Sequence, residues 1–76
     1  MIKEHDRVIL TEAIEENGLE PGDIGAVVYV HGKGEAFEVE FVTLAGKTAA
    51  VLELESHQIR LAAAHEIPHA RSLTAA

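Results

Sequence analysis

The alternation between residues 36 and 41 constrains the fold more than any other feature of this sequence. Phe37, Val39 and Phe41 occupy every second position, and Glu38 and Glu40 lie between them. Successive side chains of a β-strand point to opposite faces of the sheet. We therefore predict a strand at residues 36–41 whose three apolar side chains enter a core while its two glutamates face water.

Four other short segments are rich in β-forming residues and predict further strands, at residues 6–11, 24–31, 48–55 and 59–61. The inward side chains expected in the first and fourth strands are Val8, Leu10, Ala50, Leu52 and Leu54, with Lys47, Val51, Glu53 and Glu55 outward. In the second strand, alternation groups Ala26, Val28 and Val30 on one face and Val27, Tyr29 and His31 on the other. We expect Ile9, Val27, Tyr29 and Val42 to lie on outward faces.

Glycine and proline mark the connections between these segments. Gly32-Lys33-Gly34 and Ala45-Gly46-Lys47 predict two tight turns, and Pro21-Gly22 predicts a turn at the end of a long loop over residues 12–23. A 3₁₀ turn is expected at residues 56–58. This order predicts an all-β fold: a small five-stranded antiparallel SH3-like barrel. An OB-fold is the alternative, but the chain leaves no room for its helix.

The length of 76 residues predicts a single domain. The chain has no cysteine, so this domain has no disulfides. Aromatic residues make up only 4% of the chain, so the core must consist mainly of aliphatic side chains. We place the barrel at residues 1–61 and a C-terminal tail at residues 62–76. The tail is rich in alanine and is interrupted by Pro68. We expect it to dock on its own barrel or on a neighbouring subunit.

The net charge of −7 arises from 13 acidic residues against 6 Lys and Arg. This balance argues against binding to nucleic-acid phosphates or to an anionic membrane surface. It favours a basic protein partner, although such a charge also simply keeps a small domain soluble. The chain has no apolar run of about 18 residues, and its polar N-terminus does not resemble a signal peptide. We expect a cytoplasmic protein.

Several motifs resemble a family of small bacterial proteins catalogued as domain of unknown function 4926. They are Asp6-x-Val8-x-Leu10, Gly18-Leu19-x-x-Gly22-Asp23-x-Gly25-x-Val27-Val28, Phe37-x-Val39-Glu40-Phe41, the 51–61 segment and the tail motif Glu66-Ile67-Pro68-His69-x-Arg71. The resemblance implies an SH3-like fold, no known activity, and an accessory or antitoxin-like role beside a larger protein. Gly25 suits a bulge or a close backbone approach.

Candidate partner-binding residues lie in the predicted sheet and in the tail. Glu38, Glu40, Glu53 and Glu55 predict an acidic sheet surface, which is either a solvated face or a docking surface for Lys and Arg of a partner. The further partner-binding candidates are Tyr29, Ile67 and Arg71. We expect a non-enzymatic protein-binding module that forms a homo-oligomer and needs no cofactor, since no catalytic arrangement is evident.

Two alternative functions remain open at this point. Related-looking barrels bind RNA, but this chain lacks a basic stripe and stacking aromatic residues. His65, Glu66 and His69 are candidate metal ligands, because a spacing of four residues places two histidines on one helical face. Pro68 lies between these histidines and opposes that helix.

Overall fold

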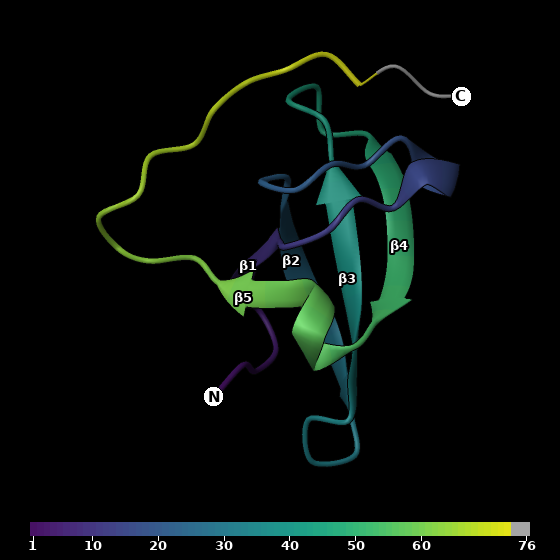
Figure 1. The fold of residues 1–76 in the computed structure, drawn as a ribbon, viewed down its shortest axis with the longest axis vertical. Coiled ribbons are helices and arrows are strands. Elements are labelled where there is room, and N and C mark those ends of the chain that lie inside the picture. Colours follow the sequence, from purple (N-terminus) through teal and green to yellow (C-terminus); the bar gives the residue numbers. More distant parts are fainter. Residues whose placement is uncertain (74–76) are drawn as a thin grey trace.

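The computed structural model describes residues 1–73 of the chain and shows an all-β fold (Figure 1). Within those residues the strands are β1 (Arg7–Leu10), β2 (Ile24–His31), β3 (Ala36–Val42), β4 (Thr48–Leu54) and β5 (Ile59–Leu61). Two 3₁₀ turns, η1 (Glu15–Asn17) and η2 (Ser56–Gln58), lie in the connections. All strand pairs are antiparallel, and the sheet order is β4-β3-β2-β1-β5. The predicted all-β class and the five strands are confirmed.

The predicted closure into a barrel is wrong. β4 and β5 form the two opposite edges of one open sheet, and no ladder joins them within residues 1–73. β5 has only three residues, and all of them pair with β1. Its other edge has no strand partner within residues 1–73. The sheet instead bends strongly, so that β5 runs across the direction of β3 (Figure 1).

The core lies on the concave side of this bent sheet. β3, in which apolar residues alternate with glutamates, contributes Phe37, Val39 and Phe41 to this core. Each of the three is at most 3% exposed, as the sequence predicts. The other buried members of the cluster are Val8, Leu10, Leu19, Val27, Leu54 and Ile59. Leu52 and Ala50 on β4 pack against this cluster but remain partly exposed, because β4 is an edge strand.

A β-bulge in β2 overturns the predicted grouping of side chains in that strand. Val27 pairs with Val39, but the next pair is Tyr29 with Glu38, so Val28 is an extra residue. One extra residue reverses the alternation beyond it. Val27 is fully buried instead of outward, Val30 packs against the core, and Val28 is exposed. Tyr29 remains outward, as predicted, because it follows the bulge.

Ile9 also differs from its prediction, whereas Val42 is exposed as expected. Ile9 lies on β1, which has neighbours on both sides, and it pairs with Ile24 on β2 and Arg60 on β5. The Ile9 side chain is only 6% exposed. Ile9 is therefore buried although alternation places it opposite Val8 and Leu10, and it is not a solvated residue.

Gly25 allows β2 and β3 to approach each other closely. A Cβ atom at this position would lie 2.5 Å from Val39 Cγ1 and 2.9 Å from Phe41 Cε2. It would also lie 3.1 Å from the backbone carbonyl oxygen of Glu40. Two of these three atoms belong to core side chains, so the absence of a side chain at Gly25 is a condition for packing β3 against β2.

The tail from Ala62 onward has no regular structure up to Leu73, and it curves back over one end of the sheet (Figure 1). Two ion pairs anchor it. The Arg60 guanidinium donates to both carboxylate oxygens of Glu66 at 3.0 and 2.8 Å. Further along, Arg71 Nε donates to Asp23 Oδ1 at 2.8 Å, and Arg71 Nη2 donates to Asp23 Oδ2. Arg71 Nη2 also donates to the Gly18 carbonyl oxygen at 2.8 Å. Residues 74–76 of the predicted tail lie outside the described residues.

Both anchors change the protonation of their acidic partners. The hydrogen bonds from Arg71 lower the pKa of Asp23 below its ordinary value, and the Glu20 backbone N–H adds to this effect. The hydrogen bonds from Arg60, assisted by the Ala63 backbone N–H, lower the pKa of Glu66 to about 2. Charged hydrogen-bond partners favour the ionised carboxylate, so both anchors persist in mild acid.

We expect Gly25→Ala to destabilise the fold by about 1–3 kcal/mol, because the new methyl group overpacks the contact with β3. The free energy of unfolding in urea measures this loss. Val39→Ala removes the atom that would lie closest to the new methyl group. The double variant should therefore lose less stability than the sum of the two single variants. Strict additivity of the two losses would contradict this account of Gly25.

We expect the tail to stay docked from pH 7 down to about pH 4 and to detach between about pH 4 and pH 2. A carboxylate with a depressed folded-state pKa contributes stability that is complete above its unfolded-state pKa. That contribution is lost as the pH falls through the folded-state pKa, which for Glu66 is about 2. The NMR signals of Arg71 Nε–H and of the tail amides report detachment, and core amides such as that of Val39 report global unfolding.

The Arg71→Gln variant is the control for this titration. At pH 7 the signals of residues 68–73 in the variant should already resemble those of the acid-detached tail. Tail signals that move in the wild type between pH 5 and pH 4, where ordinary carboxyl groups titrate, would show that these ion pairs do not hold the tail.

Candidate functional site

The outward face of β2, β3 and β4 carries most of the predicted partner-binding residues. Tyr29, Glu38 and Glu53 lie side by side in one row, because Glu38 on β3 pairs with both of the others. Glu40 lies in the next row, between Ala26 and Val51. The structure thus brings Tyr29, Glu38, Glu40 and Glu53 together, and we call this surface the acidic face.

His31 joins the acidic face at the end of β2. Its Nε2 atom lies 2.7 Å from Glu38 Oε2 and 3.9 Å from Glu53 Oε1. The Tyr29 ring meets the His31 ring edge-on, with centroids 4.9 Å apart. Sequence reasoning placed His31 on the same side as Tyr29 but did not single it out. The missing information was the register between strands, which places His31 beside two glutamates.

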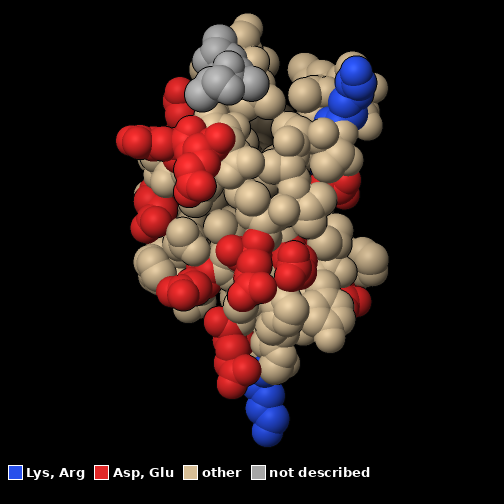
Figure 2. Space-filling view, turned by 90° about the vertical axis from the view of Figure 1, so that its right-hand side faces the viewer, with Lys and Arg blue, Asp and Glu red and all other residues tan. Residues whose placement is uncertain are grey.

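Exposed apolar side chains lie among these charges. Val28 is 45% exposed, Tyr29 52% and Val51 51%, although each belongs to a strand of the sheet. Acidic side chains cluster over the side of the molecule that carries β4, while Lys and Arg are visible only near its two ends (Figure 2). The acidic face therefore combines negative charge with an apolar surface that the described chain does not cover.

Glu55, the fourth predicted glutamate, has a different role. β4 ends at Leu54, and Glu55 is the N-cap residue of η2. Its backbone N–H donates to Gln58 Oε1 at 2.8 Å, and the two residues form a capping box. Its carboxylate lies 3.4 Å from His57 Nδ1. Glu55 is thus engaged in the turn after the strand and is not part of the acidic face.

A second feature is a cleft of about 540 Å³ between the tail and one end of the sheet. Ile24, Val42 and Leu44 line it on the sheet side, and Pro68 and Leu73 line it on the tail side. The Arg71–Asp23 ion pair lies in its wall. Ile67, a predicted partner-binding residue, does not line the cleft and is 88% exposed.

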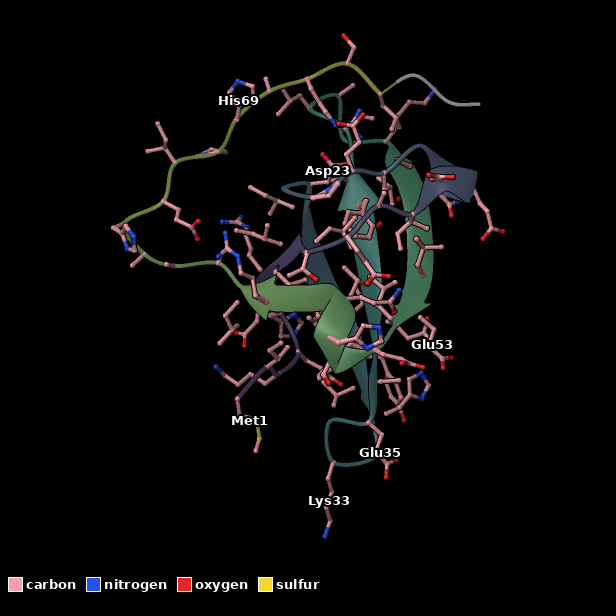
Figure 3. The ribbon with its side chains drawn as sticks, viewed as in Figure 1. Met1, Asp23, Lys33, Glu35, Glu53 and His69 are labelled. Atoms are coloured by element: carbon pink, nitrogen blue, oxygen red, sulfur yellow. The ribbon has the colours of Figure 1, made fainter. Side chains whose placement is uncertain are left out.

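The candidate tail ligands do not converge within residues 1–73. Glu66 is engaged by Arg60, and His69 lines the cleft. The described part of the tail has a turn at Ala64 and His65 but no helix, so the four-residue spacing of His65 and His69 does not place them on one helical face. Figure 3 shows His69 on the tail, well apart from Glu53 beside β4. In the described part of the chain, His31, Glu38 and Glu53 are the group whose ligand atoms do converge, within 4.8 Å of one another.

No helix in residues 1–73 is long and apolar enough to cross a membrane. In a comparison with known families, residues 4–61 match the model of a family described as a domain of unknown function, DUF4926. Neither the curated proteins nor the solved structures contain a match to this chain. The matched range ends with β5, so the tail lies outside it although the tail motif resembles the same family. Because the match covers about three quarters of the chain and all five strands, the chain belongs to the DUF4926 family.

Proposed function

We propose that this domain is a non-enzymatic protein-binding module whose acidic face docks a basic segment of a partner protein. The observation that carries the proposal is the pair Glu38 and Glu53. These two carboxylates lie directly opposite each other on neighbouring strands, an arrangement that destabilises a sheet. A surface that retains this repulsion next to exposed apolar side chains is suited to a cationic ligand.

The charges around this pair support the same proposal. Among residues 1–73, the basic side chain within ion-pair distance of Glu38 and Glu53 is His31, and no Lys or Arg lies that close to either glutamate. Glu40 accepts a hydrogen bond from Thr48 Oγ1 at 2.6 Å, which leaves its charge uncompensated. Lys or Arg side chains from a partner would relieve the repulsion and would be steered to this face by the net charge of −7.

The apolar residues of the face supply a contact area that charges alone do not. Tyr29 is the one tyrosine of the chain, and it lies next to Glu38. An exposed aromatic ring beside carboxylates can stack against an Arg or Lys of the partner as well as bury apolar surface. Val28 on β2 and Val51 on β4 extend this apolar surface on the two strands that flank β3. The best-fitting partner segment therefore combines Lys or Arg with apolar side chains.

The proposal includes a cytoplasmic location and an accessory or antitoxin-like role toward a larger protein. The absence of cysteine fits a reducing compartment, and the acidic surface keeps an unbound copy soluble. The proposed partner is a different, basic protein, because a second copy would bring like charges to the acidic face. Any homo-oligomer would then form through another surface.

The sharpest test compares two variants that lose the same charge. Glu38→Gln, Glu40→Gln and Glu53→Gln neutralise the acidic face, while Glu4→Gln, Glu15→Gln and Glu16→Gln remove three exposed carboxylates elsewhere. Each tagged protein is used to purify partners from its own cell extract in the presence of EDTA. The captured protein is then titrated against both variants at low and high salt.

We expect the wild type to capture one stoichiometric basic protein and the acidic-face variant to bind it about 5- to 150-fold more weakly. Three exposed ion pairs contribute about 1–3 kcal/mol together, which corresponds to that range. Binding should weaken with salt in the wild type and in the matched control. Equal affinity of both variants would refute the proposal, as would recovery of nucleic acid without a protein.

A further inference from the structure

We propose that His31, Glu38 and Glu53 form a binding site for a divalent transition-metal ion of the zinc class. This inference goes beyond the proposed function, because it requires no partner and can be measured on the isolated chain. The site shares Glu38 and Glu53 with the acidic face but adds His31, which contributes no negative charge for docking a basic segment.

The three ligands come from three neighbouring strands. His31 closes β2, Glu38 lies in β3, and Glu53 lies in β4 directly opposite Glu38. Their ligand atoms all lie within 4.8 Å of one another. A sheet holds its strands at a fixed spacing, so the Cα positions of the three residues are set before any ion binds. Sites built on such elements are more precisely positioned than sites on loops.

The distances fit an ion after small side-chain movements. Zinc bonds to nitrogen and oxygen of about 2.0–2.2 Å in a tetrahedron place neighbouring ligand atoms roughly 3.3 Å apart. In this structure His31 Nε2 lies 2.7 Å from Glu38 Oε2 and 3.9 Å from Glu53 Oε1, one distance below that value and one above it. Rotation of the two glutamate side chains can equalise these distances. The ion would then replace the proton of the His31–Glu38 hydrogen bond.

The types of ligand select the class of metal. An imidazole nitrogen favours Zn²⁺ and its transition-metal neighbours over Mg²⁺ and Ca²⁺, which prefer sites made only of oxygen ligands. The chain has no cysteine, so it provides no thiolate for softer ions. Glu53 is the most exposed of the three side chains, at 63%. The outer side of the site is therefore open to water, which would complete the coordination of the ion.

The bulge in β2 is what brings the nitrogen ligand to this face. Without the extra residue Val28, strict alternation would leave His31 on the same side as Val27, which is fully buried in the core. The bulge reverses the alternation and points His31 toward Glu38 and Glu53. Bulges commonly re-aim side chains in this way next to functional sites.

The test is a titration of the isolated, ¹⁵N-labelled protein with Zn²⁺, observed through the ring signals of its histidines. Each of the five histidines gives its own ring signals. The signals that shift therefore identify the histidine that binds the ion. We expect the first equivalent of Zn²⁺ to shift the His31 ring, while His65 and His69 stay unchanged. Isothermal titration calorimetry of the same protein should give a 1:1 stoichiometry.

Two variants and one control make the assignment specific. His31→Asn and Glu53→Gln should each weaken Zn²⁺ binding by about 100-fold or more, because loss of an outer-shell contact alone costs about 10- to 100-fold. The double variant His65→Asn and His69→Asn should bind Zn²⁺ with wild-type affinity. Urea unfolding of each variant verifies that it is folded, which is expected for substitutions at partly exposed positions.

Failure of this inference can be told apart from failure of the proposed function. His31→Asn should lose the metal and keep the basic partner, whereas Glu40→Gln should keep the metal and weaken docking. A dissociation constant for Zn²⁺ above about 1 mM would overturn the metal site. So would binding that persists in His31→Asn, or binding that is lost in the tail double variant, which would assign the ion to the tail histidines.

Discussion

The bulge at Val27–Tyr29 is the constraint on which both faces of this sheet depend. It allows Val27 and Val30, three residues apart, to contribute to the same core, and it turns Tyr29 and His31 to the opposite side. Without it, β2 would offer the core an aromatic ring and an imidazole. A chain this small buries only about 60% of the surface that its unfolded form exposes. Its compact aliphatic core would not accommodate a polar ring without a hydrogen-bonding partner.

The sequence predicted the strands closely where local pattern decides the structure. β3 was predictable because Phe37, Val39 and Phe41 alternate with glutamates, and its end turns were predictable because Gly34 and Gly46 adopt backbone conformations with positive φ. The bounds of β2 were also predicted, but the facing of its side chains was not, because Val27-Val28-Tyr29-Val30 is apolar throughout and gives no sign of which residue is extra. Barrel closure failed for a related reason: it depends on which distant strands pair, and composition does not report that.

The site and the tail show the same limit at longer range. The acidic face was predictable because outward glutamates on paired strands must lie near one another. The approach of His31 to Glu53 needed the register of three strands. The contact of Arg71 with Asp23 joins residues 48 positions apart, and nothing local in an alanine-rich tail indicates it. Arg71 was singled out from the sequence as part of a motif, but its partner could only come from the fold.

The shared carboxylates imply that a metal ion and a basic segment would oppose each other on the acidic face. Either ligand relieves the repulsion between Glu38 and Glu53, so whichever binds first removes the gain available to the second. A divalent ion cancels two negative charges there and leaves Glu40 as the remaining acidic contact for a partner. Because such coupling is reciprocal, a bound partner would weaken the metal by the same factor. A pair of like charges that is costly to the free sheet can thus make one small surface respond to two kinds of cation.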